Sequence, residues 1–325
     1  MCRWLVYSGP PIHLDTVLFE PENSLINQSL HARLGATATN GDGFGIGWYG
    51  DRPAPGLFRD VLPAWNDDNL RSVAEQIRSP LFFAHVRAST GTATSRSNCH
   101  PFRHGRWLFM HNGRIGGFDR IRRDLEMCID PALYAARLGT TDSEALFYLL
   151  LTRGLDADPL GATRKAVAEV LALMAAAGTQ EPFRLTAAAS DGRRTVAIRY
   201  SSDAASPSLF HGRPQLGGLD KGRGEPPIMI LSEPLDADGE TWTQVPEAHA
   251  VLVEDGAIAV HAFTPDRPAT GPRRSPAPDP NGACRRSQGL PQRSPVSSTR
   301  ARSMRAVRSS ALSRRRIITS PTSRP

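Results

Sequence analysis

Short apolar runs predict strands in the first third of the chain. They cover 2–7, 43–49, 81–86 and 106–110, between stretches of glycine, proline and polar residues, a pattern typical of strands. Segment 67–78 differs, because its apolar residues recur at helical spacing and Asp67 or Asp68 can cap its first turn. We therefore expect one helix among these strands.

Helical patterns fill the middle of the chain, and strand patterns return after it. Helices are predicted over 118–128, 142–152 and 161–176, and strands over 183–190, 194–200, 227–232, 249–253 and 256–263. This order of strands, helices and strands lacks regular β-α-β alternation. It predicts one α+β domain over 2–265, in which helices cover antiparallel sheets.

The composition changes at about residue 265. Residues 267–325 hold 14 arginines, no lysine and the single acid Asp279, whereas 1–266 hold 25 basic and 31 acidic residues. The segment 266–325 is rich in Pro, Ser and Arg and has few apolar residues, so we expect it to be disordered. Its charge suits weak attraction to nucleic acid or an acidic partner. Because no aromatic residues are interleaved, a solvated tail is favoured and nucleic acid is not an expected partner.

Other features exclude several classes of protein. The four cysteines show no paired spacing, which fits a reducing compartment. No signal peptide and no apolar run of about 20 residues is present, so a cytoplasmic protein without a membrane span is expected. The glycines at 41, 43, 45 and 47 do not follow G-x-G-x-x-G, so no dinucleotide cofactor is expected.

Cys2 follows the initiator Met1. Removal of Met1 gives a terminal residue that carries both a thiol and an α-amino group. That amine has an ordinary pKa of about 7.7–8.0, so it can accept the proton of the thiol. Cys2 is therefore a candidate nucleophile with its own base, although a Met-Cys start also arises by chance.

An oxyanion hole is the second part that such a site needs. The segment His111-Asn112-Gly113 follows the strand 106–110, and an amide side chain beside a glycine N–H can stabilise an oxyanion. The same Asn-Gly pair is common in tight turns, and on its own it favours a turn.

Charged residues at the ends of elements are candidates for binding substrate. Arg87 follows the strand 81–86 and can hold a carboxylate by a bidentate contact, or it can be a surface or ion-paired arginine. Asp142 begins the helix 142–152 and can pair with an ammonium group, or it can serve the helix terminus. Both roles are compatible if Thr141 is the cap.

One segment with a cysteine and two histidines is a candidate metal site. Cys99, His100 and His104 lie close in sequence, but no second cluster with zinc spacing accompanies them. Hydrogen-bonded loop histidines are therefore favoured, and no metal is expected. Cys128 is expected in the core and Cys284 in the tail.

Together, and in their order along the chain, these motifs resemble those of a known family. They are Cys2, Asn40-Gly41-Asp42-Gly43-Phe44-Gly45, the HVRAST segment that contains Arg87, Asn98-x-His100-Pro101, His111-Asn112-Gly113, Thr141-Asp142-Ser143-Glu144 and Leu231-Ser232-Glu233-Pro234-Leu235. Over about 2–263 the chain resembles the class II glutamine amidotransferases, especially the stand-alone type that includes the γ-glutamyl hydrolase of ergothioneine biosynthesis.

The resemblance implies a four-layer αββα N-terminal nucleophile hydrolase fold and a set of roles. Cys2 attacks the γ-carbonyl, and Asn112 and Gly113 form the oxyanion hole. The substrate-binding residues are Arg87 for the α-carboxylate, Asp142 for the α-ammonium group, and Thr90. Gly91 departs from the larger amidotransferases, many of which carry histidine there.

The expected activity is therefore hydrolysis of a γ-glutamyl amide through a thioester on Cys2, with release of glutamate and no cofactor. Glutamine, glutathione-like peptides and γ-glutamyl thiol conjugates share the same head, so the leaving group stays open. Two alternatives also stay open. One is a glutaminase subunit that delivers ammonia to a separate synthase, and the other is a non-catalytic glutamyl-binding regulator.

Overall fold

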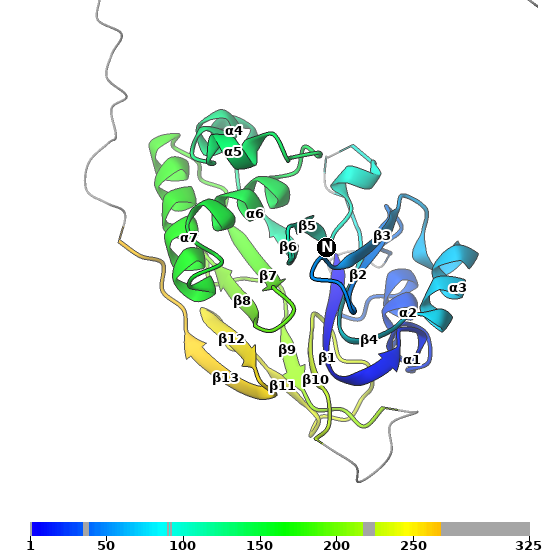
Figure 1. Ribbon diagram of the computed structural model, residues 1–325. Coiled ribbons are helices and arrows are strands. Elements are labelled where there is room, and N and C mark those ends of the chain that lie inside the picture. The colour runs from blue at the N-terminus through cyan, green and yellow to red at the C-terminus, as the bar shows by residue number, and fades with distance from the viewer. Residues whose placement is uncertain (1, 35–38, 90, 92, 217–224, 268–325) are drawn as a thin grey trace, which may run out of the picture. The chain divides into compact units, whose positions relative to one another are not determined.

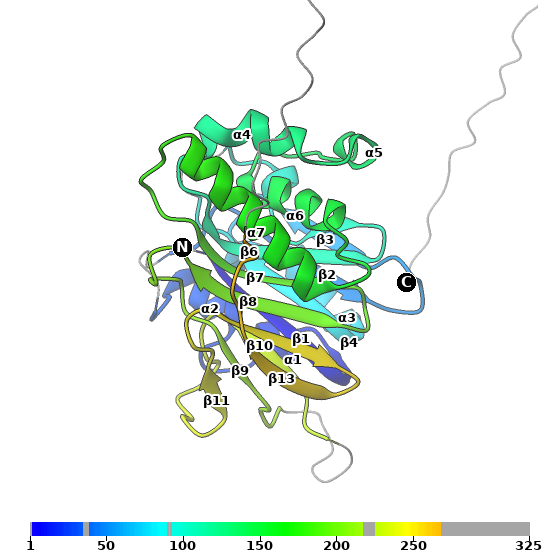
Figure 2. The same ribbon diagram turned by 90° about the vertical axis from the view of Figure 1, so that its left-hand side faces the viewer.

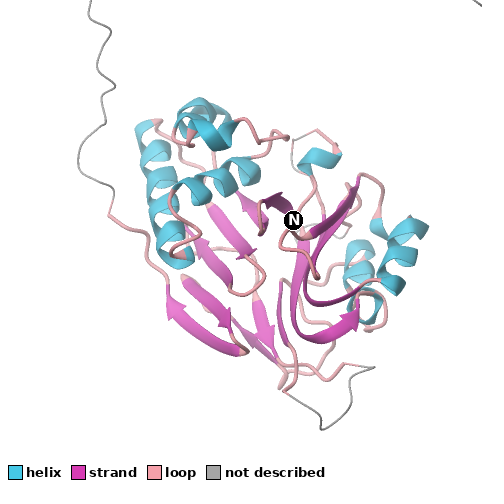
Figure 3. Cartoon of the chain, viewed as in Figure 1, coloured by secondary structure: helices cyan, strands magenta, loops and turns pink. Residues whose placement is uncertain are grey.

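Two antiparallel β-sheets form the centre of the fold (Figures 1 and 3). The computed structural model describes residues 2–34, 39–89, 91, 93–216 and 225–267. The first sheet has the order β11-β9-β10-β1-β4-β2-β3. Its strands are β1 (Arg3–His13), β2 (Phe44–Tyr49), β3 (Gly56–Asp60), β4 (Arg78–Val86), β9 (Phe210–Gly212), β10 (Ile228–Leu231) and β11 (Trp242–Gln244).

The second sheet has the order β13-β12-β8-β7-β6-β5. Its strands are β5 (Phe102–His104), β6 (Trp107–Arg114), β7 (Arg184–Ser190), β8 (Thr195–Ser201), β12 (His249–Glu254) and β13 (Ala257–Ala262). The inner faces of the two sheets pack on each other. Trp4 and Val6 of β1 share a buried cluster with Leu108 and Met110 of β6.

Helices cover the outer face of each sheet (Figures 1 and 2). The first sheet packs on α1 (Asp15–Leu18), α2 (Leu25–Leu30) and α3 (Asp68–Gln76). The second packs on α4 (Phe118–Met127), α6 (Asp142–Thr152) and α7 (Pro159–Ala176), and the short helix α5 (Pro131–Tyr134) contacts α6. Short 3₁₀ turns lie at Ala64–Asn66 and Arg96–Asn98. The layers are therefore α, β, β, α, as expected.

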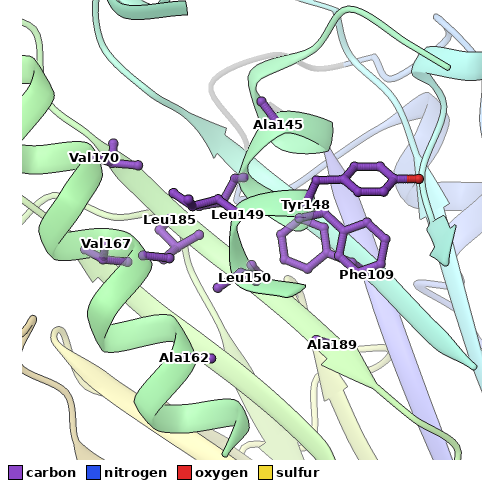
Figure 4. Packing of buried hydrophobic residues seen from close by; sticks show 14 of the residues in the cluster. Phe109, Ala145, Tyr148, Leu149, Leu150, Ala162, Val167, Val170, Leu185 and Ala189 are labelled. Carbon is purple, nitrogen blue, oxygen red and sulfur yellow. The ribbon is translucent and has the colours of Figure 1, made fainter. Parts of the chain in front are cut away.

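Each central strand is buried on both faces. In β1, Leu5 and Tyr7 face the helices while Trp4 and Val6 face the other sheet. In β6 the ring of Phe109 stacks on Phe147 of α6 at 5.3 Å, within the cluster that Figure 4 shows between β6, β7, α6 and α7. Because successive side chains of a strand point to opposite faces, burial of both faces gives the continuous apolar runs seen in the sequence.

Several predicted elements are confirmed within a few residues, including α3, α4, α6, α7 and the strands β2, β7, β8, β10, β12 and β13. The predicted strand 2–7 is too short, because β1 continues to His13 despite two prolines. A shift in its register against β4 between Ser8 and Ile12 accommodates them.

The described residues contain no helix that is both long and apolar enough to span a membrane. The domain boundary expected near residue 265 stays a prediction, and the last strand, β13, ends before it at Ala262. The predicted tail from 268 onward, including Cys284, lies outside the described residues.

Candidate active site

The nucleophile candidate lies where two central strands of the first sheet end together. Cys2 directly precedes β1, and Arg3 pairs with Val86, the last residue of β4. The partly buried Cys2 thiol therefore lies beside the segment that follows β4. Its Sγ donates to the carbonyl oxygen of Ala88 at 3.6 Å.

Asn112 and Gly113 belong to strand β6, where they pair with Thr186 and Leu185 of β7. The prediction of a tight turn, which the Asn-Gly pair favours on its own, is therefore wrong. Asn112 is only 1% exposed, and its Nδ2 has no hydrogen-bond partner among the described residues. An unpaired buried donor costs free energy, and this amide N–H has no acceptor within the described part of the protein.

Gly113 has a φ of 151°, and a Cβ at this position would collide with the carbonyl oxygen of Arg184. Only glycine meets both conditions without strain. At Gly113 the backbone of β6 thus has a conformation that few other residues adopt.

Arg87 is 3% exposed and is held by the segment that precedes β2. Its Nη1 donates to the carbonyl oxygen of Asp42 at 3.2 Å, and its Nη2 donates to Ser89 Oγ at 3.1 Å. The Asp42 carboxylate in turn accepts from the backbone N–H of Ser89 at 2.7 Å. The Asn40–Gly45 motif thereby positions the arginine.

Asp142 lies in the first turn of α6, and the neighbouring Thr141 caps that helix by accepting from the N–H of Glu144 at 3.1 Å. The Asp142 carboxylate accepts from the N–H groups of Ile115 and Ser143, both at 2.8 Å. The side chain thus joins α6 to the end of β6. Thr141 is the cap, as the sequence suggested, and Asp142 faces a cavity.

That cavity has a volume of about 290 Å³. Cys2, Arg87 and Asp142 all line it, with Gly113 and Arg114 on the β6 side. The cavity therefore places a thiol, a guanidinium group and a carboxylate around one space. Thr90 lies outside the described residues, so its role stays a prediction.

A second cavity of about 260 Å³ begins at the same thiol. Its lining shares Cys2, Ala88, Gly113 and Arg114 with the first cavity and adds Asn112, Pro182 and Arg184. Cys2 and Gly113 thus border both spaces.

The Cys2 thiol needs a base before it can act as a nucleophile. Burial raises the pKa of the Cys2 thiol, although the charges of Arg87 and Arg3 act in the opposite direction. A thiol with a raised pKa holds little thiolate at neutral pH. His111, which also lines the first cavity, contacts Ser143 Oγ at 2.9 Å and the carbonyl oxygen of Arg184 at 3.0 Å through its two ring nitrogens. Both nitrogens are therefore already engaged within the protein.

The residues considered for a metal do not converge. Cys99 donates to the carbonyl oxygens of Asp60 and Ser95, His100 stacks on His85 at 4.4 Å, and His104 packs edge-on against Tyr148. Within the described ranges, no three His, Cys, Asp or Glu side chains are grouped so that they could hold a metal. Cys128 packs at the edge of the core as a partly buried side chain.

Sequence reasoning missed two residues that support the site. Asn98 ties its loop to the start of α6, because its amide contacts Thr140 at both the backbone N–H (2.9 Å) and Oγ1 (3.2 Å). Glu233 forms a buried ion pair with Arg3 next to the nucleophile. Asn98 and Glu233 belong to the motifs Asn98-x-His100-Pro101 and Leu231–Leu235, but these motifs do not indicate which residues the two side chains contact.

The sandwich of two antiparallel sheets between helical layers has the fold of the N-terminal nucleophile hydrolases, and Cys2 directly precedes its first strand. The family model for class II glutamine amidotransferases matches residues 20–205. The chain belongs to this family, and it is an amidohydrolase.

Individual relatives agree with this membership. The chain is 35% identical to the probable glutamine amidotransferase DUG3 of Saccharomyces cerevisiae, over 80% of this chain and 84% of that protein. It is 32% identical to the gamma-glutamyl-hercynylcysteine sulfoxide hydrolase of Mycolicibacterium smegmatis, over 80% of this chain and 99% of that protein.

Solved structures share the fold. A glutamine aminotransferase class-II domain protein from Silicibacter pomeroyi is 38% identical with a TM-score of 0.63, over 81% of this chain and all of that chain. The glutamine phosphoribosylpyrophosphate amidotransferase of B. subtilis is 14% identical with a TM-score of 0.55, over 82% of this chain and 50% of that one. The latter likeness concerns the fold alone.

Proposed function

We propose that the protein hydrolyses a γ-glutamyl amide bond through a thioester on Cys2, after removal of Met1, and releases glutamate. The observation that carries this proposal is the first cavity, in which Cys2, Arg87 and Asp142 line one space. A glutamyl head has a carboxylate and an ammonium group at one end and an electrophilic carbonyl at the other. Arg87, Asp142 and Cys2 offer one group for each of them.

In the proposed reaction the free amine of Cys2 accepts the thiol proton as the sulfur attacks the γ-carbonyl carbon. Asn112 Nδ2 and the N–H of Gly113 donate to the oxyanion. The protonated amine then gives its proton to the departing nitrogen, and the thioester forms. Water, activated by the same amine, hydrolyses the thioester, so that glutamate leaves and the thiol is restored.

Arg87 is proposed to hold the α-carboxylate of the substrate, because its guanidinium is buried at the cavity wall. Asp142 is proposed to hold the α-ammonium group, and Thr90 is retained as a further proposed contact. Neither charged group touches what lies beyond the scissile bond, so they fix only the glutamyl head.

The second cavity favours a conjugate over glutamine as the substrate. It adjoins Cys2 and Gly113, so a leaving group larger than ammonia has a place to lie. A relative that this chain matches over 99% of the relative's length is named as the hydrolase of a γ-glutamyl conjugate, which supports the same substrate class. Transfer of ammonia to a separate synthase is the alternative, and it would require glutamine to be the preferred substrate.

The test combines intact mass with turnover. Purified protein is weighed and then incubated with glutamine, γ-glutamyl dipeptides and γ-glutamyl thiol conjugates while glutamate release is followed. We expect loss of Met1 and faster release from one of the conjugates. Cys2→Ala should abolish release without changing the melting temperature. Activity that survives in folded Cys2→Ala protein would rule out the mechanism.

A further inference from the structure

The nucleophile lies at a chain end, and chain ends fray unless they are tied down. We propose that Glu233 is a positioning residue that fixes Cys2 through Arg3. This inference rests on the proposed function, because it assigns a role in the reaction at Cys2. The motif that contains Glu233 has no part in the mechanism described so far.

Arg3 makes the connection with two different nitrogens. Its Nε donates to Glu233 Oε2 at 3.0 Å, and its Nη1 donates to the carbonyl oxygen of Cys2 at 2.8 Å. Both side chains of the ion pair are 1% exposed. The rigid plane of the guanidinium therefore transmits the position of the Glu233 carboxylate to the peptide bond that follows Cys2.

The Glu233 carboxylate is itself held by four donors. Besides Arg3, the side chain of Asn23 donates to Oε1 at 3.1 Å. The backbone N–H of Arg33 donates to Oε1 and that of Leu34 to Oε2, both at 2.9 Å. Charge-assisted hydrogen bonds of this kind are strong and directional. A carboxylate with so many fixed donors is a rigid anchor.

Glu233 is also the last of a series of residues, from β10 onward, that bind successive residues of the chain around the start of β1. Backbone pairing between β1 and β10 ends at Leu5 and Leu231. Ser232 then takes over, since its Oγ accepts from the N–H of Trp4 at 2.9 Å and its own N–H donates to the Trp4 carbonyl oxygen at 3.0 Å. Glu233 holds Arg3 next. The chain after β10 thus secures residues 4, 3 and 2 in turn.

Fixing this peptide plane has a chemical consequence. The carbonyl carbon of Cys2 is bonded to the same Cα as the amine and as the Cβ that carries the thiol, so holding the carbonyl restricts where both groups can lie. The amine can take the thiol proton only from a suitable direction, and a misplacement of about 1 Å can cost about 10²-fold in rate. Loss of the contact should therefore act on the chemical step rather than on glutamyl binding.

Arg3→Lys is the sharpest test in the full-length protein. Lysine keeps the charge opposite Glu233, but one ammonium cannot reproduce the fork that reaches both Glu233 and the Cys2 carbonyl. We expect kcat to fall about 10- to 100-fold with KM within about twofold. The rate of Cys2 alkylation by iodoacetamide near neutral pH should fall as well, because the amine no longer assists.

Arg153→Lys is the control away from the site, because Arg153, directly after α6, donates with two nitrogens to Glu169 of α7 in a less buried ion pair. It should lower the melting temperature with little effect on kcat. Glu233→Gln should reproduce the loss of kcat when the variant folds. Wild-type kcat and alkylation rate in folded Arg3→Lys protein would overturn the inference. The proposed function would still stand if Cys2→Ala is inactive.

Discussion

At the residue scale, Asn112 is the side chain whose surroundings are easiest to interpret. It is buried, yet its Nδ2 has no partner within the described part of the chain. A buried donor is normally paired, and this side chain also lines the second cavity together with Cys2, as an oxyanion-hole residue should. The hydrogen bonds of Asn98, by contrast, are made within the protein.

Asn112→Ala should lower kcat about 10²- to 10³-fold, the usual cost of losing one oxyanion donor. The melting temperature should change little, because the lost amide nitrogen made no internal hydrogen bond. Steady-state kinetics with a γ-glutamyl substrate and thermal unfolding measure both effects. Asn98→Ala is the control, and its main effect should be a lower melting temperature. Full activity in Asn112→Ala would remove this residue from the oxyanion hole.

Arg87→Lys should raise KM about 10-fold or more, because a point charge cannot make the bidentate contact with a carboxylate. The effect on kcat should be smaller, since the α-carboxylate lies at the opposite end of the glutamyl head from the scissile bond. Initial rates over a range of substrate concentrations separate the two constants. An unchanged KM would contradict the assignment of Arg87 to the α-carboxylate.

The candidate residues for chemistry could be identified from the sequence because each lies at one end of an apolar run or begins a helix. What the sequence did not show is which residues meet. The contact between Arg3 and Glu233 joins positions 230 residues apart, and Asp42 supports Arg87 across 45 residues. Such pairings depend on strand order, which local patterns do not encode.

At the scale of elements, burial decided which parts were predictable. Helix α6 was predicted with its observed bounds, and the central strands were recognised because both their faces are apolar. The helices α1, α2 and α5 and the strands β3, β5, β9 and β11 were missed, and each of them has six residues or fewer. Elements of this length have almost no periodicity of their own, and tertiary contacts stabilise them.

The second cavity, lined by the end of β6 and the start of β7, leads to a prediction about substrate specificity. Pro182 precedes β7 and lines the second cavity beside Cys2. Pro182→Phe should fill part of that space and lower kcat/KM for a γ-glutamyl dipeptide at least about 10-fold, the scale of a misfit side chain in a pocket. Glutamine serves as the internal control, because its small leaving group needs no such space. An equal loss for both substrates would argue against a leaving-group role for this cavity.

At the scale of the whole molecule, charge is unevenly distributed along the chain. Residues 1–266 have six more acidic than basic residues, and 267–325 have thirteen more basic than acidic residues. Each proposed catalytic residue lies in the first part. We therefore propose that 2–265 is the complete catalytic domain.

A chain ending at residue 267 should keep the kcat and KM of the full-length protein, because no proposed contact lies beyond that point. Kinetics of the two purified forms measure this. Nucleic-acid binding at two salt concentrations should be compared in parallel, since charge-driven binding falls steeply with salt. A large loss of turnover in the shortened chain would show that residues 268–325 contribute to catalysis.

Folding stability should depend on pH through the histidines that lie between the sheets and the cavity. His85 and His100 are buried and stacked on each other. Burial, and then the nearby charge of Arg87, lower the pKa of His85 to about 3. Burial also lowers the pKa of His100, with the charges of neighbouring His85 and His111 acting in the same direction.

The sign follows from proton binding. In the unfolded chain these rings take up protons below about pH 6.5, but in the folded protein they stay neutral until much lower pH. Acidification therefore favours unfolding. The stabilisation is complete above about pH 6.5 and is lost progressively as the pH falls toward 3. For His85 alone the loss between pH 6.5 and 5 amounts to about 1–2 kcal/mol.

His85→Leu should flatten this dependence, because leucine has a similar volume and no titrating group. Urea unfolding at several pH values between 7 and 5 measures the slope of the unfolding free energy. Phe82→Leu on the same strand is the control, since its side chain is fully buried and its loss should lower stability equally at each pH. If His85→Leu kept the wild-type slope while Phe82→Leu behaved as expected, another group would be responsible for the acid sensitivity of the fold.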